Sequence, residues 1–211
     1  MTRSVLFFWT LFLSLTTDAQ NKLALKNLDS TNLPLGIQYQ GKLKQAIRWK
    51  DSYGDNIVLT SETGIYINPK FKHDTEGSDA EIFAYHYIIK DTLRQTWKLY
   101  DFIRDCPVDI EATFIKQSLQ VTDLNNDDVG EIWIMYKTAC HGDVSPSEMK
   151  IIMYEADKKF AVRGRNKVYL TKTESVGGDY KFDQAFKEGP KQFRDFAIKM
   201  WNKNILHKWD E

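Results

Sequence analysis

The run Ile82-Phe83-Ala84-Tyr85-His86-Tyr87-Ile88-Ile89 consists almost entirely of β-branched and aromatic residues, the types that favour extended strands. Successive side chains of a strand point to opposite faces. One face carries Ile82, Ala84, His86 and Ile88, and the other carries Phe83, Tyr85, Tyr87 and Ile89. Both faces are apolar enough to require cover, so we expect this strand inside a covered sheet. His86 is expected to be a hydrogen-bonded core or interface residue.

Strand-like segments dominate the sequence from residue 40 to 165. They lie at 45–50, 56–61, 97–102, 149–155 and 160–163, and turn-forming residues separate them. The stretch 68–80 is polar and is expected to be an exposed loop. These short runs predict a mainly β (α+β) fold, in which antiparallel hairpins form a sheet, a partial propeller or a sandwich.

The C-terminal segment changes character. From Pro190 onward the apolar side chains recur with the spacing of an amphipathic helix. They are Phe193, Phe196, Ala197, Met200, Trp201 and Leu206. The pattern predicts a helix over about 183–204 that covers one face of the sheet, with a partner-binding helix as the alternative. No linker interrupts residues 20–211, which are expected to form a single exported β-rich domain.

The first 19 residues have the pattern of a secretory signal peptide. Arg3 precedes an apolar run, and Ala19 suits cleavage before Gln20. A membrane-spanning helix needs about 20 apolar residues, roughly twice the length of this run, so an uncleaved anchor is only the alternative. No cysteine follows the run, which argues against a lipoprotein. The sequence predicts a protein of the periplasm, cell surface or medium, without a transmembrane anchor after cleavage.

The charges of the chain balance, with 29 Lys and Arg against 29 Asp and Glu. The signal peptide contains one of each sign, Arg3 and Asp18, so the mature chain stays neutral. A neutral chain makes no overall field that attracts nucleic acid or an anionic membrane. No nucleic-acid partner is expected, although a local basic patch remains compatible with this balance. The apolar content of 42% excludes a disordered chain.

Cys106 and Cys140 are the two cysteines of the chain. Two cysteines in an oxidising compartment predict a disulfide. Closing a loop of about 35 residues would stabilise the fold by roughly 3 to 4 kcal/mol. Two free buried thiols are the alternative. A zinc site built from both cysteines and His141 is disfavoured, because neither a C-x-x-C nor an H-x3-H spacing is present.

A loop rich in side-chain oxygens runs from Asp123 to Glu131. Loop positions 1, 3, 5 and 9 hold Asp123, Asn125, Asp127 and Glu131, and position 7 is Val129. Alternate side chains of a tight loop can surround Ca²⁺, with a backbone carbonyl near position 7 completing the shell. A cation would also remove the repulsion between the carboxylates. We expect these five residues to hold one structural Ca²⁺, with a metal-free Asx-rich turn as the alternative.

The loop differs from an EF-hand, because position 6 is Asp128 rather than Gly and position 12 is Ile134 rather than Glu. Strand-like residues flank it on both sides. It resembles the calcium loops of FG-GAP and integrin-type propeller repeats, D-x-[DN]-x-D-G-x-x-[DE], and departs from them at Asp128. A left-handed conformation there is less favourable for Asp than for Gly. Gly54-Asp55-Asn56-Ile57 echoes the loop only faintly, and one loop does not make a propeller.

Five groups of residues carry a wider resemblance over about residues 97–164. They are Trp97-Lys98-Leu99-Tyr100-Asp101-Phe102, Asp105-Cys106-Pro107-Val108-Asp109, the Asp123 loop, Tyr136-Lys137-Thr138-Ala139-Cys140-His141-Gly142-Asp143-Val144-Ser145-Pro146, and Met149-Lys150-Ile151-Ile152-Met153-Tyr154-Glu155 with Arg163-Gly164. In them the chain resembles a family of uncharacterised exported proteins of Bacteroidetes and proteobacteria labelled surface polysaccharide biosynthesis proteins. The resemblance implies that the cysteines and the calcium-like loop belong to one module, and it carries over no catalytic residue.

Acidic residues and a histidine gather around the cysteines in the sequence. They are Asp101, Asp105, Asp109, His141 and Asp143. Two carboxylates and a histidine in a cleft could perform acid and base chemistry on a glycan. The sequence has no serine-elbow, H-E-x-x-H or P-loop motif, however. A Cys140–His141 nucleophile is disfavoured, because neighbours in a strand point to opposite faces and a disulfide would consume the thiol.

Three functions therefore stay open. The favoured one is an exported calcium-binding accessory or binding protein of the cell envelope, active in surface polysaccharide biosynthesis. Its partner would be a glycan or an envelope protein, bound near the Asp123 loop in an exposed cleft or on an aromatic patch that includes Trp97, Tyr100 and Trp133. The second is a glycan-acting hydrolase that uses the Asp and His residues near the cysteines. The third is a purely structural periplasmic protein whose only ligand is the cation.

Overall fold

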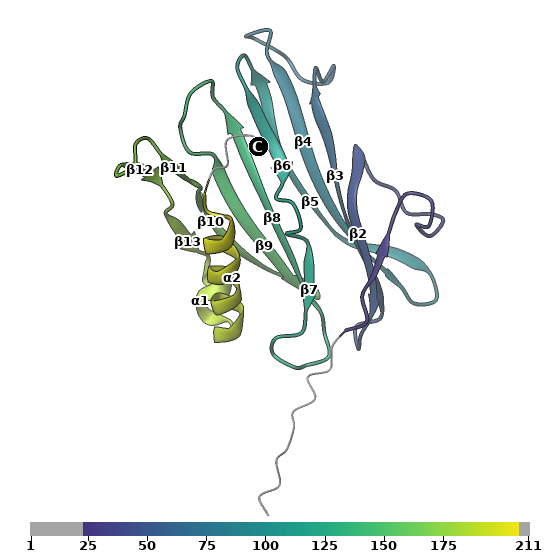
Figure 1. Cartoon of the computed structure of the whole chain (residues 1–211). Coiled ribbons are helices and arrows are strands. Elements are labelled where there is room, and N and C mark those ends of the chain that lie inside the picture. Colours follow the sequence, from purple (N-terminus) through teal and green to yellow (C-terminus); the bar gives the residue numbers. More distant parts are fainter. Residues whose placement is uncertain (1–22, 207–211) are drawn as a thin grey trace, which may run out of the picture.

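The computed structural model describes residues 23–206, which form three antiparallel sheets and two C-terminal helices (Figure 1). The predicted mainly β fold with a C-terminal helical segment is confirmed. The predicted signal peptide and its cleavage site before Gln20 lie outside the described residues. In the part of the chain that is described, no helix is long and apolar enough to cross a membrane.

The first sheet contains the N-terminal strands in sequence order, β1-β2-β3-β4-β5. Their bounds are β1 (Lys26–Leu28), β2 (Lys42–Lys50), β3 (Asp55–Tyr66), β4 (Ser78–Ile89) and β5 (Leu93–Cys106). Each strand is antiparallel to the next. Short turns join β2 to β3 and β4 to β5, and longer loops make the other two connections. The predicted run Ile82–Ile89 forms most of β4, which is buried along almost its whole length.

The second sheet contains the central part of the chain in the order β13-β10-β9-β8-β6, with β7 also paired to β8. Its strands are β6 (Ile110–Phe114), β7 (Gln120–Thr122), β8 (Glu131–Cys140), β9 (Glu148–Glu155), β10 (Lys158–Arg165) and β13 (Tyr180–Phe182). A two-stranded sheet of β11 (Lys167–Tyr169) and β12 (Ser175–Gly177) interrupts the path between β10 and β13. The short strands β1, β6, β11, β12 and β13 were not predicted from sequence, whereas β7 is the strand expected before the Asp123 loop.

The two large sheets face each other across a shared core, which selects a sandwich over a propeller. Ile47, Val58, Ile82 and Leu99 of the first sheet pack in one cluster with side chains of the second. Those partners are Ile132, Ile134, Tyr136, Ile152 and Tyr154. The predicted alternation of β4 is confirmed, since Ile82 and Ala84 face this core while Phe83, Tyr85 and Tyr87 belong to a separate cluster on the outer face of the first sheet.

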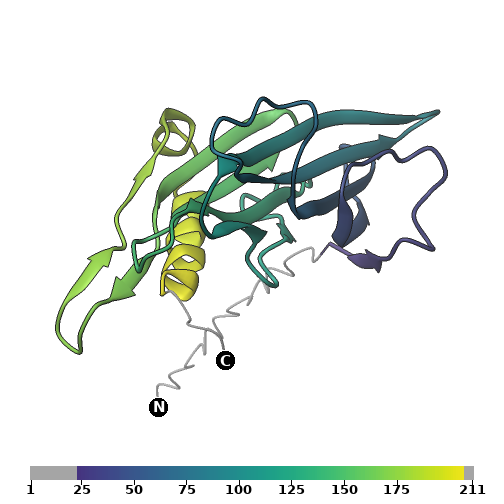
Figure 2. The same cartoon turned by 90° about the horizontal axis from the view of Figure 1, so that it is seen from above.

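The C-terminal segment forms two helices, α1 (Gln184–Glu188) and α2 (Lys191–Asn204), rather than the single predicted helix over 183–204. Gly189 ends α1 with an extended backbone, and Pro190 starts α2. Proline lacks the N–H that a continuous helix would use, so the two helices stay separate. Both pack on the outer face of the second sheet, where Trp133 and Trp201 are completely buried, and α2 lies on one side of the green strands in both views (Figures 1 and 2).

The edge strand β6 has its free side covered by a side chain of the first sheet. Oε1 of Glu62 accepts hydrogen bonds from the backbone N–H of Phe114 at 2.7 Å and from the hydroxyl of Thr113 at 2.8 Å. Its other oxygen lies 3.0 Å from Nζ of Lys44. Glu62 thus satisfies a backbone donor that the sheet leaves without a strand partner.

A candidate cation loop and a groove beside the disulfide

The loop from Asp123 to Glu131 connects β7 to β8 and is folded by its own carboxylates. The two oxygens of Asp123 accept the backbone N–H groups of Asp127 and Asp128 at 3.1 and 3.2 Å. Oδ1 of Asp127 accepts the N–H of Val129 at 3.0 Å. These bonds bend the chain into a compact turn of the kind that Asx side chains form. The structure thus gathers four of the five predicted ligands, Asp123, Asn125, Asp127 and Val129, in one hydrogen-bonded turn that ends at Glu131.

The loop contains two residues in the left-handed conformation. Asn126 has φ of 58° and Asp128 has φ of 61°. Asn and Asp are the non-glycine residues that enter this region most readily, because their short polar side chains bond locally. The left-handed position that calcium loops fill with Gly is therefore present at Asp128, and an aspartate occupies it.

Two glutamates face each other beside the loop. Glu131 begins β8 directly opposite Glu155 at the end of β9, and like charges in such pairs destabilise a sheet. Burial raises the pKa of Glu131 to about 7, which the hydroxyl of Thr122 and the N–H of Leu124 oppose by donating to its carboxylate. Burial and the charge of Asp127 raise the pKa of Glu155 as well. The loop therefore concentrates negative charge at a poorly solvated place.

The oxygen donors of this loop fit a hard cation in their chemistry. Asn125 donates its amide N–H groups to Asp127 and Glu155 at 2.9 and 2.8 Å, while its Oδ1 is buried and accepts nothing within the described residues. Carboxylate and amide oxygens are the ligands that Ca²⁺ prefers. Within residues 23–206, however, no three His, Cys, Asp or Glu side chains already converge as a metal cluster. Calcium at this loop stays a prediction, and its binding would exchange some of the present hydrogen bonds.

The turn between β2 and β3 braces the loop from the other sheet. Oδ2 of Asp51 accepts the N–H of Gly130 at 2.9 Å and the indole N–H of Trp49 at 2.7 Å. The carbonyl of Asp128 accepts both the N–H and the hydroxyl of Ser52, at 2.8 and 2.7 Å. A Cβ atom at Gly130 would lie 2.8 Å from Nε1 of Trp49, so this close approach requires glycine. The β2–β3 turn and the Asp123 loop, whose sequences are weakly similar, are thus in direct contact.

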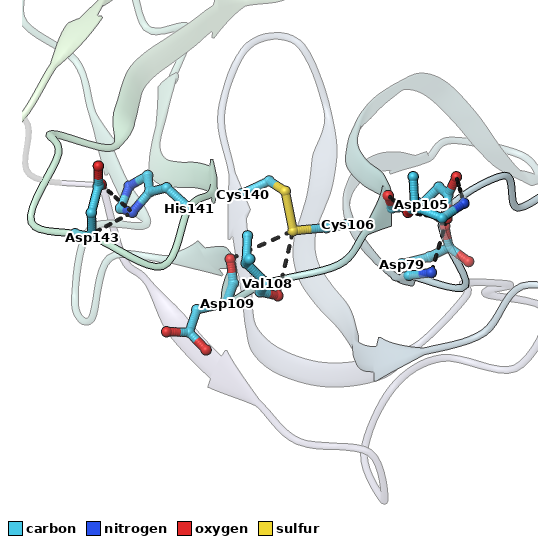
Figure 3. The surroundings of a disulfide bond; sticks show 10 residues. Asp79, Asp105, Cys106, Val108, Asp109, Cys140, His141 and Asp143 are labelled. Atoms are coloured by element: carbon cyan, nitrogen blue, oxygen red, sulfur yellow. Dashed lines mark hydrogen bonds and ion pairs between the residues drawn. A yellow bond between two sulfur atoms is a disulfide. The ribbon is translucent and has the colours of Figure 1, made fainter.

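The predicted disulfide between Cys106 and Cys140 is present and joins the ends of β5 and β8, one from each large sheet (Figure 3). Its Cα atoms lie 5.8 Å apart, and the bridge spans 34 positions of sequence. The described residues contain no free cysteine, so the free-thiol and zinc alternatives are not realised. A disulfide of this kind favours an oxidising compartment.

A groove of about 1010 Å³ lies beside this bridge on the helix-bearing side of the second sheet. Strands β6 and β8 form its floor, and the segment after Cys140 and the end of α2 form its rim. Its polar lining includes Asp109, Glu111, Lys116, Lys137, His141, Asp143, Ser147 and Lys203. On the floor, Glu111 accepts the hydroxyl of Ser147 at 2.6 Å and lies 3.7 Å from Nζ of Lys137. The lining carries three carboxylates and three lysines, so it is close to neutral.

The acid and base candidates from the sequence are divided by the structure. Asp109, His141 and Asp143 line the groove together. Figure 3 has Asp105 on the other side of the disulfide, where its carboxylate accepts the N–H of Asp74 at 2.7 Å. Asp101 lies between the sheets, bonded to the hydroxyl of Tyr136. The disulfide therefore brings the two segments together without collecting all five side chains at one site.

The predicted aromatic patch of Trp97, Tyr100 and Trp133 does not form. Trp133 is completely buried under the helices. The ring of Trp97 stacks on Tyr154 between the sheets, with centroids 4.0 Å apart. Tyr100 alone is exposed, on the outer face of the first sheet. The prediction was wrong because each residue faces a different layer, which depends on strand register and cannot be read from residue type.

A different aromatic row is exposed around Tyr100. Phe102 lies beside it with ring centroids 5.3 Å apart, and Phe71 lies 6.4 Å from Phe102. The guanidinium of Arg104 covers the ring of Phe71 at 3.5 Å. The exposed fractions of Tyr100 and Phe102 are 43% and 38%. This row is a second surface at which a ligand could stack.

Sequence reasoning missed Glu155, Asp51 and Glu111. Glu155 closes a strand 24 residues after Glu131, and the like-charged pair is visible only once the register of β8 and β9 is known. Asp51 looked like an ordinary turn former. Glu111 was missed because it belongs to the groove floor. Charged and small residues alternate on either side of Cys140, and this alternation was the one sequence signal for that floor.

Comparison with known proteins adds no relative: no protein-family model matches the chain, and no curated protein and no solved structure matches it.

Proposed function

We propose that this protein is an exported binding protein of the cell envelope that holds a neutral saccharide in the groove beside the disulfide and carries a structural Ca²⁺ in the Asp123 loop. The observation that carries the proposal is the groove itself, with its polar and nearly charge-balanced lining. Ligand pockets are usually the largest concave sites with a few convergent polar groups. The resemblance of residues 97–164 to surface polysaccharide proteins supports a saccharide as the ligand.

The lining of the groove suits a sugar chain. Sugars present hydroxyl groups together with patches of C–H, and the groove offers charged, hydroxyl and amide groups beside Ile110, Phe114 and Leu206. Its floor lies on paired strands, and the disulfide joins the two sheets at its end. A rigid floor lowers the entropy that binding must offset. The calcium would act at a distance from the groove, by holding the connection between β7 and β8.

The proposal is tested by calorimetric titration of the mature chain with maltotetraose, cellotetraose and chitotetraose. The variant Lys203→Glu changes the groove rim, and Asn202→Glu is its matched control, because Asn202 precedes it on the exposed helix surface and does not line the groove. We expect one of these tetrasaccharides to bind, and Lys203→Glu to weaken the binding by about tenfold. Asn202→Glu should leave it unchanged.

Two results would contradict the proposal. No binding of any of the three tetrasaccharides would remove the neutral-saccharide assignment. Binding that is lost in Phe102→Ala but kept in Lys203→Glu would move the site to the aromatic row around Tyr100. The melting temperatures of all variants are measured alongside, so that a loss of binding is not confused with unfolding.

A glycan hydrolase is the second candidate, and His141 favours it. Its Nδ1 lies 3.2 Å from the carbonyl oxygen of Asp143, which can only accept, so Nδ1 carries the proton. Nε2 keeps its lone pair when the ring is neutral. This atom is buried and has no partner among the described residues, so proton transfer to a substrate requires the ring to turn toward the groove, where Asp109 and Glu111 lie. Release of reducing ends from the same tetrasaccharides, lost in His141→Gln, would select the hydrolase over the binding protein.

A further inference from the structure

Four basic side chains share the face of the second sheet that looks toward the first sheet. Lys150 of β9 is the direct cross-strand partner of Arg163 of β10, and Arg163 is the direct partner of Lys181 of β13. Lys159 precedes Arg163 on the same face of β10, opposite Tyr154. We call Lys150, Lys159, Arg163 and Lys181 the cation row. Three of its members are exposed, and Lys150 is partly buried.

Such an arrangement opposes folding. Like charges directly opposite each other on neighbouring strands destabilise a sheet, and the cation row repeats this across three strands. Partial burial and the charge of Arg163 lower the pKa of Lys159, which reflects the same repulsion. A chain that is neutral as a whole therefore concentrates positive charge at one place.

Few carboxylates compensate this charge. Asp101 of the first sheet lies 2.6 Å from Nζ of Lys150. Among the described residues, no carboxylate lies within ion-pair distance of Lys159, Arg163 or Lys181.

Two further carboxylates are near but already engaged. The charge of Asp183 works to raise the pKa of Lys159, but the oxygens of Asp183 already accept the N–H groups of Ala161 and Phe186 at 2.8 and 2.9 Å. The charge of Lys181 helps to lower the pKa of Asp179, but Asp179 is already paired with Arg165 at 2.8 Å. The cation row therefore keeps an excess of positive charge that the protein itself does not neutralise.

Aromatic rings lie directly beside these cations. Nζ of Lys150 is 5.7 Å from the ring of Tyr136, and Nζ of Lys159 is 5.9 Å from the ring of Tyr154. The indole of Trp97 is stacked between Tyr154 and His86, with ring centroids 4.0 and 5.4 Å away. Its N–H is buried and has no acceptor within the described residues. These rings therefore lie beneath the cations, and the exposed surface itself consists of the charged groups.

We propose that the cation row binds an acidic saccharide, whose carboxylate or sulfate groups pair with Arg163, Lys181 and Lys159. Charge complementarity supplies the attraction, and a chain that carries several anionic groups can pair with several of these cations at once, which a single bare anion cannot. The choice of a saccharide as the anion rests on the proposed function. Binding would also remove the repulsion along the cation row. This surface lies on the face of the second sheet opposite the groove, since Ile152 and Ala161 beside it belong to the core between the sheets.

The test is titration of the mature chain with tetragalacturonate, a heparin-derived tetrasaccharide, maltotetraose and inorganic sulfate. The variant Arg163→Gln/Lys181→Gln removes two charges of the cation row. Its matched control, Lys158→Gln/Lys167→Gln, removes two charges elsewhere, because Lys158 is on the opposite face of β10 and Lys167 lies in β11. We expect at least one acidic tetrasaccharide to bind much more tightly than sulfate, and the first variant to weaken it by at least about tenfold. The control should change it less than about twofold.

The proposal is overturned if neither acidic tetrasaccharide binds, if sulfate binds as tightly as they do, or if both double variants behave alike. Misfolding is recognised separately: relief of like-charge repulsion predicts that Arg163→Gln/Lys181→Gln melts no lower than the unchanged chain. The result is also separable from the groove proposal, which concerns neutral tetrasaccharides and Lys203. Loss of one binding activity with retention of the other identifies which proposal is wrong.

Discussion

The carboxylate of Asp51 accepts the backbone N–H of Gly130 at 2.9 Å. A turn of the first sheet therefore holds the residue that directly precedes β8 of the second sheet. The same carboxylate also accepts the backbone N–H groups of Tyr53 and Gly54 and the amide of Asn56. One side chain therefore organises its own turn and fixes the end of the Asp123 loop against it.

Replacement of Asp51 by Ala is expected to destabilise the protein by about 2 to 4 kcal/mol, because Trp49 and Gly130 would keep buried donors without an acceptor. Chemical denaturation followed by tryptophan fluorescence measures this change. Asp91→Ala is the matched control, since Asp91 lies in the exposed turn between β4 and β5. Equal stabilities of the two variants would show that the Asp51 bonds contribute nothing.

Calcium is expected to raise the melting temperature by roughly 5 to 10 °C at a concentration 100 times its dissociation constant, compared with chelator. The physical reason is that the ion would neutralise Asp123, Asp127 and the glutamates beside them. Asp127→Asn should abolish the difference, and Asp91→Asn should preserve it. An identical melting curve with Ca²⁺ and with chelator refutes the site.

Reduction of the disulfide is expected to lower the free energy of unfolding by roughly 3 to 4 kcal/mol, since Cys106 and Cys140 close a loop of 34 positions. The double variant with Ala at both positions should reproduce this loss without reductant. Mass analysis after alkylation of the protein purified without reductant tests the bridge itself, and labelling of both cysteines would contradict it.

Acid is expected to destabilise the fold through His86, which is 2% exposed. Burial lowers its pKa to about 4, while Asp51 and Asp157 oppose this shift and Arg94 adds to it. The unfolded chain therefore binds more protons than the folded one between about pH 6.5 and pH 4. The contribution of His86 is complete above pH 6.5 and falls as the pH drops, by up to roughly 3 kcal/mol. Glu131, whose pKa is raised to about 7, contributes in the opposite sense over the same range, so the effect of His86 is isolated by comparison with its own variant. Denaturation across this range measures the slope, which His86→Phe should reduce; an unchanged slope would assign the protons to other groups.

Much of the fold could be predicted because strand composition and alternation are local properties. The run Ile82–Ile89 needed no knowledge of its neighbours to be read as a strand buried on both faces. The disulfide followed from the cysteine count and the expected compartment. Both inferences depend on residue type and chain order alone.

The sites were harder to predict because they depend on register and on which face each residue takes. The opposition of Glu131 to Glu155, and of Arg163 to Lys150 and Lys181, appears only when the strands are paired. The aromatic patch was predicted wrongly for the same reason. Without the strand register, the sequence does not show that Trp97, Tyr100 and Trp133 belong to three different layers. The close spacing of the loop residues could be read from the sequence because it is local, whereas the groove joins segments distant in the sequence.

The position of Glu62 over the edge of β6 has a consequence for self-association. An uncovered strand edge is a template on which a second copy can add its own strand and begin a fibre. The Glu62 carboxylate occupies the N–H of Phe114, so an incoming strand cannot use this donor of the edge. The side chain of Glu62 therefore opposes edge-to-edge association of the protein at this end of β6.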